Sequence, residues 1–321
     1  MQAGLLHQAT FALYGATVKV ECDTSCSMAM MWIMTVYVDD PVRLGESRLS
    51  DGRLLGWAEW GPLDGVPVLL CPGAATSRWL GFGAGVVEAL GVRLVSVDRP
   101  GLGASTPAPG RTFSDFAGDI RQLRVLRGLE RPAVIGNSQG APFALACAEE
   151  GVASALAVVS GADEVAAPEF ASALAADLRG FVERTQDDPV GAEEIFAGFS
   201  ADAMWDMVIS GSPECDLAVY QDPDFAVAYR RALDEGFVQG AAGYARDTVL
   251  AMGRWPFVLD EIDVPVDIWY GERDTSHSPD HGALLATRMP SAHRRVVPGI
   301  GGALLWAHAE SILTSLLGIM R

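Results

Sequence analysis

One serine stands in a sequence pattern that could make it a nucleophile. Ser138 lies in Gly136-Asn-Ser-Gln-Gly140, between the apolar run Pro132–Gly136 and the helical pattern Gln139–Glu150. A G-x-S-x-G pattern between a strand and a helix is typical of a sharp turn that strains the serine backbone and exposes its hydroxyl. Because both flanks fit, we prefer this interpretation to a chance match in a loop. The pattern therefore predicts acyl transfer through Ser138.

Two further segments extend this pattern into a resemblance to a known family. The segment Asp98-Arg-Pro-Gly-Leu-Gly-Ala-Ser105 has the form D-R-P-G-x-G-x-S, and Tyr270-Gly-Glu-Arg-Asp274 has the form G-x-x-D after a late apolar run. From about residue 45 to residue 319, the chain resembles the α/β-hydrolase superfamily. The similarity is to its bacterial single-domain branch with a helical lid, which includes proline iminopeptidase-like and esterase-like enzymes. The resemblance implies a hydrolase with a serine nucleophile, because epoxide hydrolases and haloalkane dehalogenases of the same fold use an aspartate there.

The resemblance also implies which acid would assist the serine. Asp274 would orient and stabilise a catalytic imidazolium, although a loop aspartate of this kind can instead cap the next helix. Asp163, in Ser160-Gly-Ala-Asp after the preceding strand, is the fallback acid.

A second loop would supply part of the oxyanion hole. In the family the loop after the first long strand carries His-Gly, and here Pro72 aligns with the histidine and Gly73 with the glycine. The hole needs backbone donors aimed at the developing oxyanion, so the shape of the loop matters more than the side chain at position 72. We therefore expect the backbone N–H groups of Ala74 and Gln139 to form it.

The histidine of the family pattern is absent from its usual place. In the family it follows the last strand and opens the final helix, and the aligned residue here is Gly302. Without a general base, Ser138 would remain a neutral alcohol. Of the five histidines, His277 is the best surrogate because it lies three residues after Asp274, in a loop expected to rim the pocket. A solvated side chain is nevertheless the more ordinary expectation for such a loop residue.

Short apolar runs alternate with amphipathic segments along the chain. This pattern predicts an α/β fold with a mostly parallel sheet and helices on both faces. The predicted strands are Gly52–Trp60, Val66–Cys71, Val92–Val97, Pro132–Gly136, Ala155–Ser160, Val264–Tyr270 and Arg294–Val297. The predicted helices are Thr112–Leu129, Gln139–Glu150, Pro279–Arg288 and Ala303–Leu317.

The domain organisation follows from where this alternation stops. Residues 164–260 lack strand-like runs and have apolar residues at helical spacings, so we interpret them as a helical lid inserted into the core. The core would comprise residues 34–163 and 261–321. We expect residues 1–33 to be a disordered N-terminal extension, because Met34 resembles a second initiator and begins the ordinary-looking sequence. Residues 1–24 contain a single Lys or Arg, unlike an export signal.

Composition limits the partners of the protein. The 321 residues include 23 Lys and Arg and 41 Asp and Glu, a formal charge of −18, which argues against nucleic acid or an anionic membrane as a partner. No apolar run approaches the roughly 20 residues of a membrane span. Five cysteines, an odd number in a chain of this size, favour a reducing, cytoplasmic location. No metal or cofactor motif is visible. The resemblance to hydrolases implies a small-molecule substrate with a carbonyl group as the partner.

Three functions remain open from the sequence. The first is a serine hydrolase that acts on an ester, lactone or small amide with a non-standard or incomplete triad. The second is a lyase, cyclase or isomerase on the same scaffold, which would polarise a carbonyl without an acyl-enzyme. The third is a ligand-binding pseudoenzyme with an apolar pocket beneath the lid.

Overall fold

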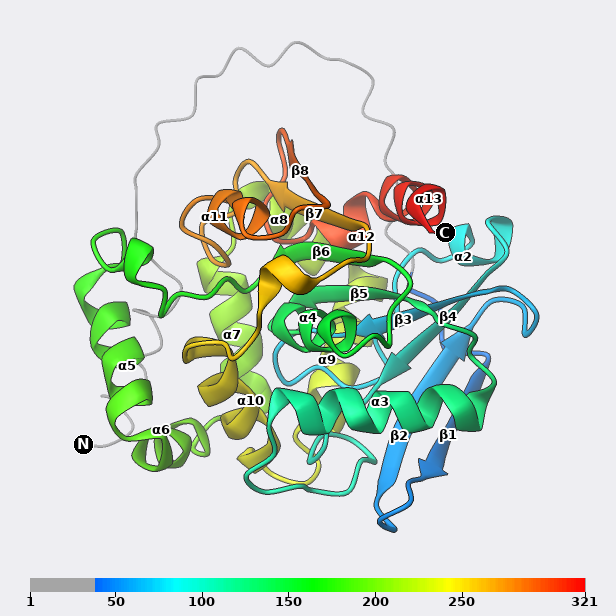
Figure 1. Cartoon of the computed structure of the whole chain (residues 1–321), viewed down its shortest axis with the longest axis horizontal. Helices are drawn as coiled ribbons and strands as arrows, with labels where there is room; N and C mark the ends of the chain where they lie inside the picture. The colour runs from blue at the N-terminus through cyan, green and yellow to red at the C-terminus, as the bar shows by residue number, and fades with distance from the viewer. Residues whose placement is uncertain (1–37, 321) are drawn as a thin grey trace.

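The computed structural model describes residues 38–320, and the expected extension, residues 1–33, lies outside them. Within the described residues, eight strands form one sheet in the order β1-β2-β4-β3-β5-β6-β7-β8 (Figure 1). The strands are β1 (Arg43–Arg48), β2 (Leu54–Trp60), β3 (Val66–Cys71), β4 (Val92–Val97), β5 (Ala133–Ser138), β6 (Leu156–Gly161), β7 (Val266–Gly271) and β8 (Ala292–Val297). Strand β2 is antiparallel to both β1 and β4, and the other pairs are parallel. The predicted mostly parallel α/β sheet is confirmed.

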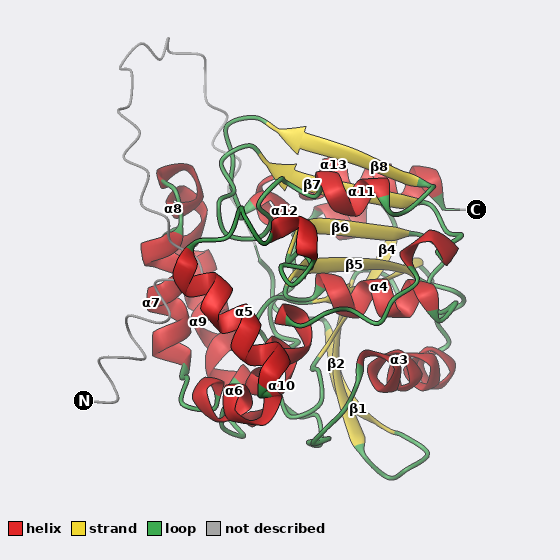
Figure 2. Ribbon diagram, turned by 60° about the vertical axis from the view of Figure 1, so that its left-hand side comes forward, coloured by secondary structure: helices red, strands yellow, loops and turns green. Residues whose placement is uncertain are grey.

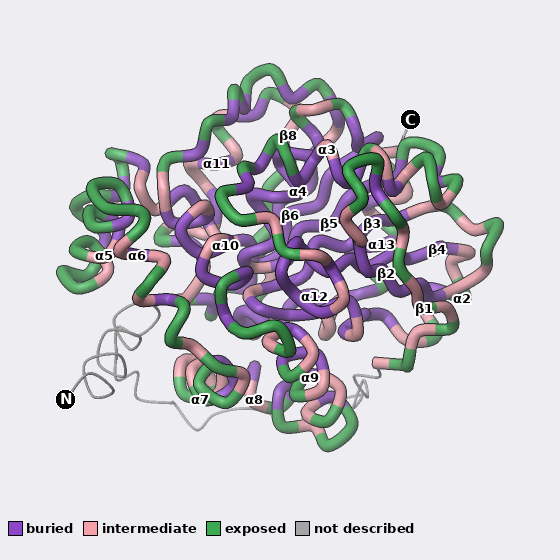
Figure 3. The backbone as a smooth tube through the Cα atoms, turned by 90° about the horizontal axis from the view of Figure 1, so that it is seen from below, coloured by how far each residue is buried: buried purple, intermediate pink, exposed green. Residues whose placement is uncertain are grey.

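Helices cover both faces of the sheet. The helices are α2 (Val86–Ala89), α3 (Phe113–Arg127), α4 (Ala141–Glu149), α5 (Ala176–Asp187), α6 (Pro189–Phe196), α7 (Ala201–Gly211), α8 (Glu214–Tyr220), α9 (Pro223–Gly236), α10 (Ala242–Met252), α11 (Ala283–Thr287), α12 (Leu304–Ala307) and α13 (Ala309–Ile319). One buried apolar cluster joins the sheet to α3, α4 and α11, and the other joins it to α2, α12 and α13. The central strands are consequently the most deeply buried part of the chain (Figure 3).

The differences from the predicted elements have local causes. Strand β1 was not predicted because it is an edge strand in which intermediate and exposed residues alternate, so its sequence contains no apolar run. The predicted helix Pro279–Arg288 begins only at Ala283, because His281 and Gly282 have left-handed φ angles of 54° and 72°. The predicted helix Ala303–Leu317 is divided in two at His308, whose φ of −127° is not helical.

The segment between β6 and β7 is helical. Helices α5 to α10 all lie in it, and the structure has no strand between residues 164 and 260. Figure 2 shows these helices gathered beyond the ends of β7 and β8, where the loops after the parallel strands also lie. We call helices α5 to α10 the cap. The cap packs into the same apolar cluster as α12 and α13.

Across residues 38–320, none of the helices combines the length and the apolar character that crossing a membrane would require.

Candidate active site

Ser138 ends strand β5 in a backbone conformation that side-chain-bearing residues rarely adopt. Its φ is 50°, in the left-handed region. A Cβ atom on Gly136 would lie 2.6 Å from Cα of Ala141, and a Cβ atom on Gly140 would lie 2.0 Å from the carbonyl oxygen of Cys71. Glycine is therefore required at both positions, because the strand, the turn and helix α4 approach one another too closely for a side chain. The predicted sharp turn is present.

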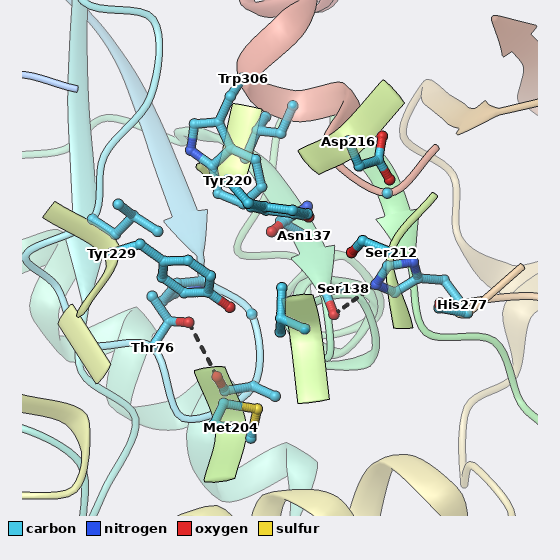
Figure 4. Close-up of a pocket in the computed structure, with 18 of the residues that line it drawn as sticks. Thr76, Asn137, Ser138, Met204, Ser212, Asp216, Tyr220, Tyr229, His277 and Trp306 are labelled. Atoms are coloured by element: carbon cyan, nitrogen blue, oxygen red, sulfur yellow. Dashed lines mark hydrogen bonds between the residues drawn. The ribbon is translucent and has the colours of Figure 1, made fainter. Parts of the chain in front are cut away.

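The side chain of His277 lies between Ser138 and Asp274. Its Nε2 atom is 3.0 Å from Oγ of Ser138 (Figure 4). Its Nδ1 atom is 2.9 Å from both carboxylate oxygens of Asp274. The side chain of His277 is 14% exposed and that of Asp274 is 1% exposed. The expectation that His277 is a solvated residue at the pocket rim is wrong, because its ring is enclosed and both nitrogens have partners. The expectation that Asp274 only caps a helix is also wrong.

The loop after β7 folds tightly enough to bring these groups together. Oδ1 of Asp274 accepts hydrogen bonds from the backbone N–H of Ser276 at 3.0 Å and of His277 at 3.3 Å. Nε2 of His281 lies 2.9 Å from the backbone oxygen of Asp274. Because β5 and β7 are parallel members of the same sheet, the loops after them emerge at one edge, which explains how residues 139 positions apart meet.

Asp163, the fallback acid, holds this loop and does not contact the His277 ring. Its backbone N–H donates to the carbonyl oxygen of His277 at 3.0 Å, and its Oδ2 accepts from the hydroxyl of Ser278 at 2.7 Å. Burial raises the pKa of Asp163 to about 6, although the Ser278 hydroxyl and the Glu164 N–H oppose this shift. Asp163 is thus hydrogen-bonded to two consecutive residues of this loop, to the backbone of His277 and to the side chain of Ser278.

The electrostatics favour an ion pair between His277 and Asp274. Burial by itself would raise the pKa of Asp274, but the charge and hydrogen bond of His277, together with two backbone N–H groups, lower it. Burial likewise opposes the charged form of His277, but Asp274 outweighs it and raises the pKa of the imidazole, with a further contribution from Asp216. An imidazolium at this position is therefore stabilised, as a proton acceptor for Ser138 requires.

Comparison with known proteins agrees with this fold. A family model described as alpha/beta hydrolase fold matches residues 66–190. A non-heme chloroperoxidase from Streptomyces lividans is 25% identical over 312 residues, covering 87% of this chain and 100% of that protein. The chain has the α/β-hydrolase fold.

Other α/β-hydrolase relatives are similar over different lengths. A proline iminopeptidase from Neisseria meningitidis is 33% identical over 119 residues, which is 35% of this chain and 37% of that enzyme. Among solved structures, a thermophilic esterase from Thermogutta terrifontis superposes with a TM-score of 0.63 at 19% identity, covering 87% of this chain and 100% of the esterase. An esterase from a Rhodococcus species gives a TM-score of 0.60, also at 19% identity, covering 87% of this chain and 99% of that esterase.

The two expected oxyanion donors lie next to Ser138. A Cβ atom on Gly73 would be 3.4 Å from Cβ and 3.8 Å from Oγ of Ser138, so the loop after β3 passes directly over the serine. Ala74 lines the same cavity as Ser138. Within residues 38–320, the N–H groups of Ala74 and Gln139 have no hydrogen-bond partner, which leaves them able to bind a ligand oxygen.

Gly302, which the sequence analysis expects at the position of the family's histidine, lies against the imidazole. A Cβ atom at this position would be 2.8 Å from Cε1 and 3.3 Å from Nδ1 of His277. The neighbouring Gly301 donates its N–H to Oδ1 of Asp216 at 2.8 Å. The ring of His277 therefore occupies space that a side chain at position 302 would need.

Asp216 is a site residue that the sequence analysis missed. It belongs to α8 of the cap, is 1% exposed, and lines the cavity together with His277 and Gly302. Burial raises the pKa of Asp216, against the effect of the backbone N–H groups of residues 301–303. Its sequence neighbourhood, Glu214-Cys-Asp-Leu, resembles any acidic first turn of a helix, so no local signal marks it.

A cavity lies above Ser138. Figure 4 shows Ser138 and His277 on one side and the aromatic rings of Tyr220, Tyr229 and Trp306 on the other. Met204 and Met207 of α7 line it from the cap. Among the described residues, no group of three or more His, Cys, Asp or Glu side chains is arranged to hold a metal ion.

Proposed function

We propose that this α/β-hydrolase is a serine hydrolase that cleaves an ester, lactone or small amide. Ser138 would be the nucleophile, His277 the general base and Asp274 the acid that orients the base. The observation that carries this proposal is the 3.0 Å separation between Nε2 of His277 and Oγ of Ser138, because a base must reach the proton that it removes. Several structural neighbours are esterases, which agrees with this substrate class.

The geometry supports a two-step mechanism. Oγ of Ser138 forms a bond to the substrate carbonyl carbon while its proton passes to Nε2 of His277. The carbonyl electron pair moves to the oxygen, and the N–H groups of Ala74 and Gln139 would stabilise the resulting oxyanion. When the intermediate collapses, the bond to the leaving group breaks and His277 returns the proton to it. Water then releases the acyl group from Ser138 by the same steps, again with His277 as base.

In this proposal the base comes from a different loop than in the family. The family places its histidine where this chain has Gly302, and His277 reaches the same serine from the loop after β7. The contact between Gly302 and the imidazole supports the exchange, because the absence of a side chain at position 302 leaves room for the ring. The alternative of a lyase, cyclase or isomerase, or of a pseudoenzyme, depended on the lack of a base, so the position of His277 weakens it.

The cap would act as the lid of this site. Helices α7 and α8 contribute Met204, Met207 and Asp216 to the cavity, so substrate must contact cap residues when it reaches Ser138. We also retain as part of the proposal a small-molecule substrate with a carbonyl group, no nucleic-acid or membrane partner, and a cytoplasmic location. The three cysteines among the described residues are free, in agreement with a reducing compartment.

A fluorophosphonate probe tests the proposal directly. The full chain should be labelled at Ser138, and Ser138→Ala should lose both the label and the hydrolysis of p-nitrophenyl butyrate. Ser47→Ala is a suitable control, because Ser47 lies on the edge strand β1, outside the cavity. A wild-type chain that is not labelled at Ser138 would rule the hydrolase out.

A further inference from the structure

Arg99 lies behind the turn that carries the proposed oxyanion donor Ala74. Its side chain is completely buried, with 0% exposure. Its Nη1 donates to the carbonyl oxygen of Pro72 at 2.5 Å, and its Nη2 donates to the carbonyl oxygen of Gly73 at 2.9 Å. Resting on the function proposed above, we infer that Arg99 is a positioning residue that aims the Ala74 N–H at the substrate oxyanion.

The geometry of the peptide bond links the two groups. The carbonyl of Gly73 and the N–H of Ala74 belong to the same planar trans peptide, so they point in opposite directions. When Arg99 fixes the carbonyl oxygen on its own side, the N–H must point to the other side of the turn. Ser138 and the cavity are close by, since Gly73 borders Ser138 and Ala74 lines the cavity. A cation at the oxygen also polarises the amide, which strengthens its N–H as a donor.

Arg99 also contacts the residue that carries the second proposed donor. Its Nη2 lies 3.5 Å from Oε1 of Gln139, and Nε2 of Gln139 donates to Oγ1 of Thr248 at 2.9 Å. The side chain of Gln139 is thus held between Arg99 and the cap helix α10. The two turns that would form the oxyanion hole, the one after β3 and the one after β5, share a single guanidinium.

The cap holds Arg99 itself in place. Its Nε forms an ion pair with Oδ2 of Asp247 at 2.6 Å, and Asp247, also 0% exposed, is paired with Arg111 as well. The guanidinium lies 4.9 Å from the ring centre of Phe143 on α4. All three nitrogens of the guanidinium are therefore held by buried partners, as a positioning role requires.

The test separates binding of the oxyanion from binding of the carbonyl compound. A trifluoromethyl ketone such as 1,1,1-trifluoro-2-octanone accepts Ser138 Oγ at its carbonyl carbon, the serine proton passes to His277, and the product is a tetrahedral oxyanion. The parent 2-octanone binds without this addition. The ratio of their two inhibition constants against p-nitrophenyl butyrate therefore measures how well the oxyanion hole is formed.

For Arg99→Lys, we expect the trifluoromethyl ketone to bind about 10- to 100-fold more weakly and kcat to fall by a similar factor. This loss is smaller than the loss of kcat when a whole oxyanion donor is removed. The affinity for 2-octanone and the KM should change less than about twofold, because these report ground-state contacts. Arg93→Lys is the matched control: Arg93 is 6% exposed and pairs with Glu59 at 2.6 Å, away from the cavity. It should lower stability without changing the ratio of inhibition constants.

A folded Arg99→Lys chain with an unchanged ratio would overturn the inference and leave the hydrolase proposal standing. If Arg99→Lys does not fold, Asp247→Asn provides the same readout, because Arg99 then loses the carboxylate that fixes its Nε. For Asp247→Asn we expect a smaller loss of affinity for the trifluoromethyl ketone, with the affinity for 2-octanone unchanged. If the two affinities change equally, the role of Arg99 is contradicted. A wild-type chain that binds both ketones equally and is not labelled at Ser138 would instead overturn the hydrolase proposal, and this inference with it.

Discussion

A Cβ atom on Gly302 would lie 2.8 Å from Cε1 of His277, so the glycine and the imidazole occupy complementary space beside Ser138. The ring leaves no room for a side chain at position 302, and the missing side chain at position 302 leaves room for the ring. If His277 is the base, as we propose, this pairing would allow the base to come from a different loop without a change in the position of the serine.

Gly302→Ala should displace His277 and impair hydrolysis. The added methyl group cannot occupy its position unless the ring moves, and a displacement of about 1 Å can lower the rate about 100-fold. Turnover of p-nitrophenyl butyrate measures the effect. Gly118→Ala is the control, because nothing lies within 4 Å of a Cβ atom at this position in α3. Equal activity of Gly302→Ala and wild type would contradict the proposed packing.

His277→Ala should lower kcat by on the order of 10⁴- to 10⁶-fold if His277 is the base, since a triad without its base retains only the oxyanion hole and binding. His293→Ala, an exposed residue of β8, should leave kcat unchanged. A fall of less than about tenfold in His277→Ala would exclude it as the base.

The proposal that the base comes from a different loop can be tested by placing a histidine in the loop that the family uses. In the His277→Ala background, the space beside Gly302 is empty, so Gly302→His should recover about tenfold or more of the lost kcat by providing a base from the loop that the family uses. The same Gly302→His substitution in the wild-type chain should reduce activity, because two rings would compete for one space. Further loss of kcat in the double variant would show that the site cannot accept a base from that loop.

The pH dependence of kcat/KM should show the titration of His277. The base works when neutral, and Asp274 and Asp216, the two carboxylates facing it, both favour its charged form. The pKa of the imidazole is therefore raised, so activity should rise with pH around a midpoint above the ordinary histidine value of 6.5.

Asp216→Asn should move this midpoint to lower pH. The substitution removes a negative charge near His277, which destabilises the imidazolium and lowers its pKa, while the amide oxygen can still accept the Gly301 N–H. Rates of p-nitrophenyl butyrate hydrolysis between about pH 5 and pH 9 measure the shift. An unchanged midpoint would mean that Asp216 holds the turn but does not influence the base.

Asp163 should make the free energy of unfolding depend on pH. Its pKa is raised to about 6 in the folded protein from 3.8, so folding favours the protonated form. Its contribution is therefore complete below about pH 4 and is lost as the pH rises through about 6, a change of about 3 kcal/mol. Asp163→Asn mimics the neutral form, so denaturant titrations at several pH values should show a smaller decline for this variant than for the wild type. Parallel stability profiles would contradict the assignment.

Most of the fold could be predicted from the sequence because its signals are local. The apolar runs of the buried parallel strands, the glycines around Ser138 and the absence of strand patterns between residues 164 and 260 depend on neighbours along the chain. Strand β1 escaped prediction because an exposed edge strand needs no apolar run. The division of the last helix at His308 escaped it because the composition on both sides is equally helical.

The sequence by itself determined the fold class, the strained turn at Ser138 and the candidate acid, since each of these depends on local patterns of residues. Only the tertiary structure decided which histidine lies against the serine. His277 and Ser138 are 139 residues apart, and their 3.0 Å contact exists because two parallel strands end at the same edge of one sheet. The same is true of Asp216 and Arg99, whose contacts join the cap to the turns around the serine. Spacing along a chain cannot reveal such contacts, because they depend on where separate elements meet.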